Sequence, residues 1–307
     1  MGLRIQTNVN SLFAQRQLGI TTRNLSTHTE RLSSGFRINK AADDAAGLAI
    51  AKKLEGQVRS LHQNKRNASD AISLVQTAEG GLNEITNLVV RLKELSVQAA
   101  SDTIGDNERG YLQKEFGSLK NEIDRIAVAS EFNGTRLLVG NSPLPDVLRE
   151  NSNIPPLEFQ VGPNYHADID SLGIKNPTNI IRLDLSELNA LTEGPGSLDI
   201  GNEEDAQGTR VDSKQAAQMS MTRLENALDR ISNYRATLGA VQNRLGSSIN
   251  NLGIQIENLD SAKSRILDAD YAEESAHVVQ QGILQKAGVS VLSQANQMPE
   301  LALKLLG

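Results

Sequence analysis

Two adjacent acids, Asp43 and Asp44, are the residues in this chain whose types and spacing most suggest chemistry. They lie between RLSSGFRINKAA and AAGLAIA, within residues 31–54. Paired carboxylates can act as general acid and base, but such a site also needs a partner group and a concave pocket, and the sequence indicates neither. An Asp that accepts backbone N–H bonds at a helix start, followed by a second acid near the positive end of the helix dipole, accounts for the pair without catalysis. We therefore predict a helix start at Asp43 and Asp44.

The other chemically able side chains are scattered along the sequence. The four histidines are His28, His62, His166 and His277. They lack the i,i+3 or i,i+4 spacing of a helical metal site, and the absence of cysteine excludes a thiol nucleophile and thiolate ligands. Tyr165, His166, Asp168 and Asp170 lie close together, but in a turn-rich stretch without a convergent partner. We predict a protein that is not an enzyme, with no catalytic residue, cofactor or metal.

The composition favours an elongated helical protein. Five phenylalanines and four tyrosines are the only aromatic residues among 307, so the bulky side chains of a thick core are scarce. The formal net charge is −6 and basic residues are interspersed with acidic ones, which argues against a nucleic-acid partner. No stretch approaches the roughly 20 apolar residues of a membrane helix, and the first residues do not resemble a cleavable secretory signal.

Proline divides the chain into two helical flanks and a middle segment. Seven of the eight prolines lie within 143–195, which excludes a continuous helix there. In the C-terminal flank, spacing that alternates between four and three residues predicts a heptad seam. Its positions are Leu224, Leu228, Ile231, Arg235, Leu238, Gln242, Leu245, Ile249, Leu252, Ile256 and Leu259. Arg235 and Gln242 interrupt it, either as a polar layer that fixes register or as contacts with other subunits.

The N-terminal flank carries a matching seam. Its positions are Leu54, Val58, Leu61, Lys65, Ala68, Ile72 and Val75, then Ile85, Leu88, Leu92, Leu95 and Ala99. We expect a register shift between the two runs, within residues 78–82. Helices over 44–100 and 211–266 would each be roughly 80 Å long, which favours antiparallel packing. A third, shorter helix is expected around residues 112–126.

Three short stretches are typical of strands. They are NGTRLLV from Asn133, LEFQV at 157–161 and IIRLDL at 180–185. The predicted fold class is mostly α: a long antiparallel helical coiled-coil rod with paired N- and C-terminal helices and a small β-hairpin region in the middle of the chain.

Both ends of the chain carry apolar helical patterns that can pair and would still leave apolar surface. Leu18, Leu25 and Leu32 recur every seven residues, and the chain ends in LALKLLG. Such surface favours burial against other copies. The residues expected to take part are Leu18, Leu25, Leu32, Ile266, Ile283, Leu292, Leu301 and Leu305.

Words at both ends of the chain resemble bacterial flagellin. They include IQTNVNSL at 5–12, ERLSSGFRINKAADDAAGLAIA at 30–51, RNASDAISLVQTAEGGLNEI at 66–85, NEIDRIAVASEFNGTRLL at 121–138, SRILDADYAEESA at 264–276 and QKAGVSVLSQANQMPELALKLL at 285–306. The resemblance implies an inner coiled-coil filament-core domain with a spoke (1–43 and 262–307) and a helical rod domain (44–139 and 207–261). It also implies a β-hairpin region of the rod (140–206), with no large outer domain.

The resemblance further implies a structural subunit that self-assembles into the helical filament of the bacterial flagellum. Its expected partners are itself, the flagellar export apparatus, an export chaperone that holds the C-terminal segment, and the filament cap and hook-associated proteins. The chain would be secreted unfolded, without a cleavable signal peptide, and polymerise outside the cell. The alternatives are a hook-filament junction protein, which shares the terminal helices, and a coiled-coil adaptor.

Some members of this family are detected by Toll-like receptor 5, and the resemblance carries over three candidate contacts. Arg91 and Leu95 lie in VRLKELSVQ at 90–98, and Glu115 lies on the expected third helix. Val90 and Lys93 depart from the residues that other members often carry. Leu95 also belongs to the predicted seam, so assembly alone could require it.

Overall fold

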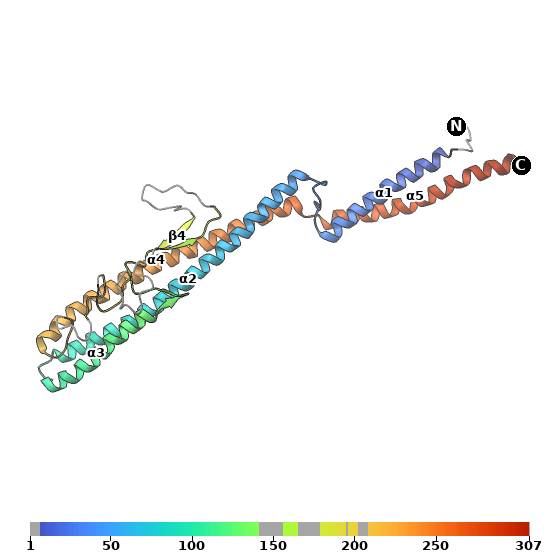
Figure 1. The fold of residues 1–307 in the computed structure, drawn as a ribbon. Helices are drawn as coiled ribbons and strands as arrows, with labels where there is room; N and C mark the ends of the chain where they lie inside the picture. Colours follow the sequence, from blue (N-terminus) through green and yellow to red (C-terminus); the bar gives the residue numbers. More distant parts are fainter. Residues whose placement is uncertain (1–6, 141–155, 165–178, 195, 202–207, 307) are drawn as a thin grey trace. The chain divides into compact units, whose positions relative to one another are not determined.

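The computed structural model describes residues 7–140, 156–164, 179–194, 196–201 and 208–306, with the side chains of 298–306 left outside the description. Within these residues the chain is mostly α-helical, as predicted, with five helices and two small antiparallel sheets (Figure 1). It divides into two compact units, Met1–Arg59 with Glu257–Gly307, and Ser60–Ile256.

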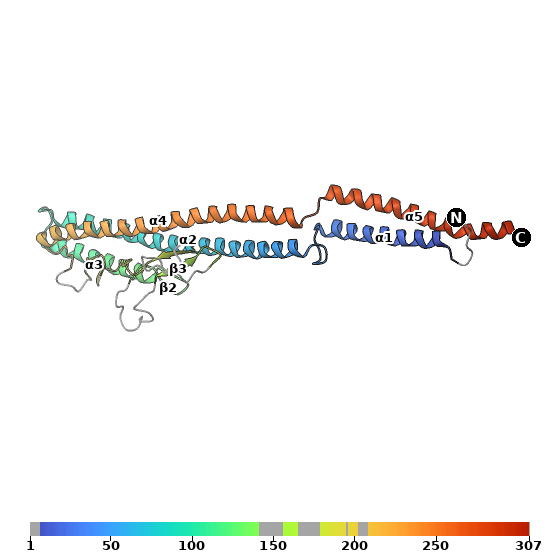
Figure 2. The same ribbon diagram turned by 90° about the horizontal axis from the view of Figure 1, so that it is seen from above.

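The first unit is built on a pair of antiparallel helices. α1 spans Val9–Ser34 and starts after Asn8, whose side chain accepts a hydrogen bond from the Ser11 N–H. α5 spans Tyr271–Leu306 and lies beside α1 in both ribbon views (Figures 1 and 2). At one end of the pair, Asn8 Nδ2 donates to the Ala295 carbonyl at 2.7 Å. The predicted pairing of the terminal helices is confirmed.

Three helices frame the second unit. They are α2 (Ala45–Ala99), α3 (Asp106–Ala129) and α4 (Lys214–Leu267). α2 and α4 are antiparallel, because Lys93 pairs with Glu225 while Glu79 pairs with Arg235. The division between the two units falls inside α2 and α4, at 59–60 and 256–257, whereas the expected domain boundaries were 43–44 and 261–262. The first turns of α2 and the last turns of α4 therefore belong to the first unit.

The buried seam of α2 keeps one register through the second unit. One heptad column is Leu61, Ala68, Val75, Leu82, Val89 and Ser96, and the other is Asn64, Ala71, Ala78, Ile85, Leu92 and Ala99, all buried. The spacing alternates between three and four residues without a break, so the predicted register shift is wrong. The second column contains small and polar residues, so hydropathy alone does not show its register. The larger neighbours Ile72 and Leu88, which were predicted in the seam, are only half-buried.

α4 follows the predicted seam fully along one column and partly along the other. Leu224, Ile231, Leu238, Leu245 and Leu252 are buried. In the second column Ile256 is buried as predicted, but Ala227 and Val241 are buried where Leu228 and Gln242 were expected, and Arg235 and Gln242 are half-buried. Arg235 Nη2 lies 3.9 Å from Glu79 Oε1 on α2. Both polar residues therefore flank the seam within one subunit rather than interrupt it.

The side chain of Arg109 links the end of α2 to the start of α3. The buried guanidinium of Arg109 donates to the carbonyl of Ala99, the last residue of α2 (2.8 Å), and to that of Ser101 (3.1 Å). It also pairs with Asp106 in the first turn of α3 at 2.7 Å. One side chain therefore fixes the reversal between the two helices.

Two short hairpins extend from the helices. Their strands are β1 (Glu131–Phe132), β2 (Thr135–Arg136), β3 (Leu157–Gln160) and β4 (Ile180–Leu183). β1 and β2 are joined by Asn133 and Gly134, whose φ angles of 50° and 77° give the left-handed backbone of an Asn-Gly hairpin turn. β3 pairs antiparallel with β4. The predicted strand stretches are confirmed at all three places.

The described residues between β4 and α4 (184–194, 196–201 and 208–213) form no helix or named strand and pack on the helices. They bury Leu185, Leu188, Leu191, Leu198 and Ile200. Asp124 of α3 holds this stretch, because its carboxylate accepts hydrogen bonds from the Thr192 N–H at 2.8 Å and the Thr192 hydroxyl at 2.7 Å.

Gly81 allows the chain after α3 to approach α2. A Cβ at this position would lie 2.5 Å from Ser130 Oγ and 2.8 Å from Leu138 Cδ1, whereas one at Gly80 would meet nothing within 4 Å. The AEGGL stretch at 78–82 therefore marks a close contact instead of a change of register.

Candidate assembly site

The joint between α1 and the long helices is a short β-like crossing within the first unit. α1 ends at Ser34, and the next residue, Gly35, caps it with a left-handed backbone at φ 73°. The Arg37 N–H then donates to the Leu267 carbonyl at 2.6 Å, and the Ala269 N–H donates to the Gly35 carbonyl at 2.9 Å. Arg37 also donates through its guanidinium to the Ile266 carbonyl at 2.8 Å. The last carbonyls of α4 are thus capped by a cation, the favoured charge at that end of a helix.

Asp43 and Asp44 have different structural roles. Asp44 is the residue before α2, and its carboxylate accepts a hydrogen bond from the Gly47 N–H at 2.8 Å, as an N-cap does. Asp43 instead accepts from the backbone N–H groups of Lys40 and Asn39, at 2.9 and 3.0 Å. These two bonds lower the pKa of Asp43. Asp44 therefore lies at the start of α2, whereas Asp43 closes the preceding turn and does not lie in the first helical turn.

Gly47 gives the N-cap room to form. A Cβ there would overlap the Asp44 carboxylate and would lie 2.9 Å from Cδ1 of Ile38, which is buried. The glycine in AAGLAIA is therefore required by the contact between the joint and the first turn of α2.

The predicted assembly side chains divide into half-buried and exposed sets. Leu18, Leu25, Leu32, Ile266 and Leu292 are half-buried in the first unit. Ile283 is exposed over 63% of its surface. Leu301 and Leu305 belong to α5, but their side chains lie outside the described part of the chain.

Further apolar residues of the terminal helices are exposed, and the heptad argument missed them. Val9, Leu12 and Phe13 on α1 are each more than half exposed. The same is true of Val289 and Val291 on α5. The α1 residues do not belong to the series Leu18, Leu25 and Leu32, which recurs every seven residues. Only the hydropathy of each whole helix could have revealed these exposed residues.

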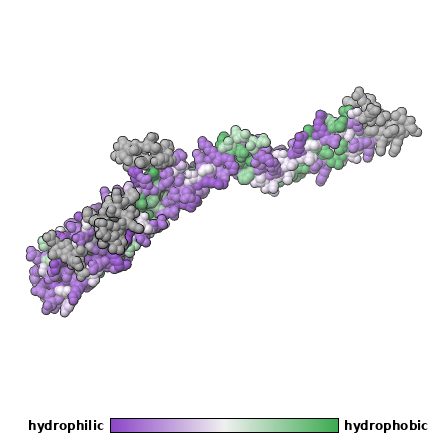
Figure 3. Space-filling view, viewed as in Figure 1, coloured by the Kyte–Doolittle hydropathy of each residue, from purple (hydrophilic) through white to green (hydrophobic). Residues whose placement is uncertain are grey.

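Apolar surface is visible over two parts of the first unit. One area follows the α1–α5 pair, and another covers the start of α2, where Ile50 is 52% exposed (Figure 3). A shallow groove between the two terminal helices is lined by Phe13, Ala14, Gly288, Val291 and Ala295, with Asn10 and Gln17. Such a surface is suited to packing against another apolar helix.

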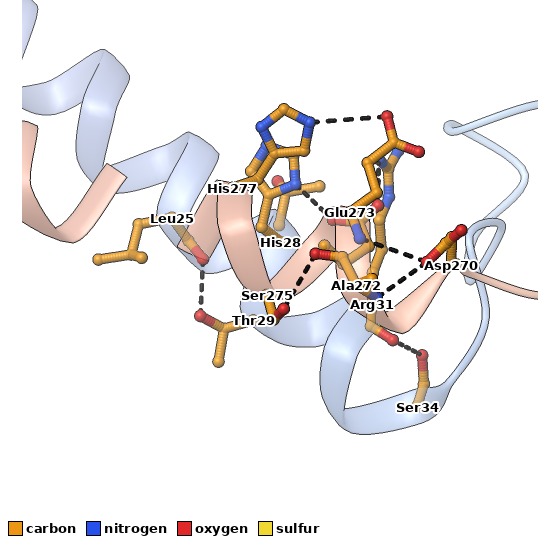
Figure 4. Close-up of polar contacts among 12 residues, drawn as sticks. Leu25, His28, Thr29, Arg31, Ser34, Asp270, Ala272, Glu273, Ser275 and His277 are labelled. Carbon is orange, nitrogen blue, oxygen red and sulfur yellow. Dashed lines mark hydrogen bonds and ion pairs between the residues drawn. The ribbon is translucent and has the colours of Figure 1, made fainter. Parts of the chain in front are cut away.

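A polar cluster crosses the α1–α5 pair near the joint (Figure 4). His28 Nδ1 lies 2.6 Å from Glu274 Oε2, and Arg31 Nη1 lies 3.4 Å from the other oxygen of that carboxylate. His28 and His277 stack with ring centroids 4.8 Å apart. Burial acts to raise the pKa of Glu274, but His28 and Arg31 outweigh it and lower this pKa overall. Sequence spacing could not reveal the cluster, because its histidines come from opposite ends of the chain.

The candidate receptor contacts lie on the second unit. The Arg91 guanidinium pairs with Glu115 on α3 at 2.8 Å and with Glu94 at 3.1 Å. The bond to Glu115 is the largest influence that raises the pKa of Arg91. Leu95 is fully buried in the core. Its side chain is therefore not available on this surface, and the predicted contact by Leu95 is corrected to a packing role.

An exposed apolar groove accompanies Arg91 on α2. It is lined by Val90, Lys93, Glu94, Val97 and Gln98. The two valines are 42% and 55% exposed, so this outer face of α2 is free to contact another protein.

The described residues offer little for other chemistry. They contain no group of three or more histidine or acidic side chains arranged to hold a metal ion. The stretch with Tyr165, His166, Asp168 and Asp170 lies outside the described residues. No helix in the described ranges is both long and apolar enough to cross a membrane.

Two family models match this chain. The model of the bacterial flagellin N-terminal helical region matches residues 5–142, which include α1, α2, α3 and the first hairpin. The model of the bacterial flagellin C-terminal helical region matches residues 221–306, which include most of α4 and α5.

Several known proteins are similar over nearly the full length. A flagellin of Bacillus subtilis (strain 168) is 38% identical, with 99% of this chain and 100% of that protein covered. Flagellin FlaB2 of Treponema pallidum (strain Nichols) is 36% identical over 98% of this chain and 99% of its own length. The crystal structure of Bacillus cereus flagellin matches 61% of this chain and 88% of its own, with 26% identity and a TM-score of 0.44.

Proposed function

Because this chain belongs to the bacterial flagellin family and is a structural subunit of the flagellar filament, we propose that it polymerises by burying the outer apolar faces of its α1–α5 pair against other copies. The observation that carries the proposal is the exposure of Val9, Leu12 and Phe13 on α1 and of Val279 and Ile283 on α5, each more than half exposed. Fully burying one such side chain contributes about 1.5–3 kcal/mol, so several per subunit can drive association.

The proposed domain roles follow the family. The terminal segments 1–43 and 262–307 act as the filament core with its spoke, and 44–139 with 207–261 as the rod between subunits. Residues 140–206 act as the β-hairpin region of the rod, without a large outer domain. The closed core of the second unit supports the rod role, since such a body can transmit contacts without rearranging.

Export and capping complete the proposal. The chain leaves the cell unfolded through the flagellar export apparatus, an export chaperone covers its C-terminal segment, and the filament cap and hook-associated proteins bound the polymer. Two observations support this route: the chain has no cysteine that could cross-link it, and α5 has exposed apolar side chains that need cover before assembly.

A charge substitution on α5 tests the assembly mechanism. Ile283→Asp is expected to abolish seeded polymerisation or to raise the critical concentration at least about tenfold, because an unpaired carboxylate would be buried between subunits. Gln280→Asp is the matched control, because it adds the same charge at another exposed position of α5 and should polymerise nearly normally. Electron microscopy and sedimentation give the readout. Normal filaments from Ile283→Asp would refute burial of this face.

Truncation tests the end of α5. A chain that lacks residues 301–307 is expected to keep the unfolding transition of its second unit and to polymerise poorly. If the truncated chain forms filaments as readily as wild type does, the terminal turns of α5 take no part in assembly.

A second role rests on the exposed groove beside Arg91. The accessible Arg91–Glu115 pair and the neighbouring Val90 and Val97 support recognition by Toll-like receptor 5. In a receptor reporter assay, Arg91→Ala should weaken the response to folded monomer, with Arg125→Ala on α3 as a control that also removes an exposed arginine. Equal responses to both variants and wild type would exclude Arg91 as a contact.

A further inference from the structure

The polar cluster between α1 and α5 gathers titratable groups from both helices. Its charged and titratable members are His28 and Arg31 on α1, and Glu273, Glu274 and His277 on α5. Asp270 lies just before α5, where its carboxylate caps the helix by accepting from the N–H groups of Ala272 and Glu273. The two helices therefore meet through a cluster whose charge depends on its histidines.

The geometry of the two rings makes their charges interdependent. His28 contacts the buried Glu274 carboxylate, so a proton on this ring completes an ion pair between α1 and α5. A second proton on His277 would place another cation against the first, with centroids 4.8 Å apart and an interplanar angle of 25°. Glu273, at 3.8 Å from His277, belongs to the same helix and adds no attraction between the helices.

Among these five side chains, with the capping Asp270 left out of the count, the balance of charge reverses when both rings are protonated. With neutral rings, the single positive charge of Arg31 faces the two negative charges of Glu273 and Glu274. With two imidazolium rings, three positive charges face the same two negative charges. Histidine is the side chain whose ordinary titration lies between pH 5 and 8, so pH 8 and pH 5 are the two conditions to compare.

We propose that the stacked pair His28–His277 is a pH-sensitive latch on the α1–α5 pair, which holds while at most one ring is protonated and weakens when both are. In the polymer, the effect of the latch is measured as a change in filament stability. This measurement rests on the proposed assembly function, in which the α1–α5 pair holds the filament together.

A double-mutant cycle tests the latch in the full-length chain. Wild type, His28→Gln, His277→Gln and the double variant are polymerised at pH 8 and pH 5 with a chelator present. Glutamine keeps an N–H donor but cannot take a charge. At pH 8 the coupling between positions 28 and 277 should change the critical concentration by less than about threefold, as expected for a neutral ring stack.

At pH 5 the sign of the coupling should reverse. Repulsion between two stacked cations at partly exposed sites should raise the wild-type critical concentration about tenfold relative to His277→Gln. A coupling that is the same at both pH values would overturn the latch, even if all four filaments weaken in acid.

Hydrogen exchange separates failure of the latch from failure of the assembly function. If wild type forms no polymer at any pH, the assembly proposal fails, and amide exchange along α1 in the soluble chain then tests the latch. Faster exchange in wild type than in His277→Gln at pH 5, but not at pH 8, supports it. Equal exchange in the four chains at pH 5 overturns it.

Discussion

The two compact units bury apolar side chains to very different extents. In the second unit Leu82, Phe116 and Leu238 have no exposed surface, since three helices and the chain after β4 surround them. In α1 only Ala14 and Thr21 are buried, and Phe13 is 60% exposed. A two-helix pair has a single seam and cannot cover its outer faces, whereas three helices with a covering chain close a core. The second unit therefore has a closed core, whereas the first leaves apolar surface that other copies can cover.

The two units should respond most differently to the removal of one aromatic ring from each. Phe116→Ala should lower the free energy of unfolding of the monomer by about 3–5 kcal/mol, because it leaves a cavity in a closed core. Phe13→Ala, its matched control, should change that quantity by less than about 0.5 kcal/mol, as surface substitutions do, while weakening polymerisation. Urea unfolding followed by far-UV circular dichroism measures both. Equal losses from the two variants would contradict the division of roles.

Two adjacent glycines offer a finer test within the second unit. Gly81→Ala should cost about 1–3 kcal/mol of unfolding free energy, because the new methyl group meets Ser130 and Leu138. Gly80→Ala should instead stabilise by roughly 0.5–1 kcal/mol, since the site is open and alanine is the better helix former. The difference is measurable in the same urea experiment. Stabilisation by both alanines would show that the chain after α3 is not packed closely on α2.

Much of this fold could be predicted because its signals are local. Asn133–Gly134 specifies a hairpin turn from two residues, and alternation at 157–161 marks a strand. The terminal pair followed from apolar periodicity in α1 and α5. These features depend on the conformational preferences of short segments, which a single sequence displays.

The remaining features depend on which helix faces which. Ala71 and Ala78 are buried, although their small side chains give no strong signal in the sequence. Leu95 suits either a core or a contact, and only packing shows that it is fully buried. The stack of His28 on His277 requires knowledge of the register between α1 and α5. Spacing within one segment cannot supply such relations.

The smallest expected effect concerns Asp44 and Asp43, and it tests whether the joint is independent of the closed core. In the assembled protein, Asp44→Ala should speed amide exchange at Gly47 and cost about 1 kcal/mol, the usual loss for an N-cap. Asp43→Ala should instead speed exchange at Asn39 and Lys40 and leave Gly47 protected. Because hydrogen bonds lower the pKa of Asp43 from its ordinary 3.8, its contribution is complete above that pH and is lost only as the pH falls through the lowered value. Exchange at pH 7 therefore measures the Asp43 contribution in full. If either variant also speeds exchange in the part of α2 within the second unit, the joint and the closed core are coupled.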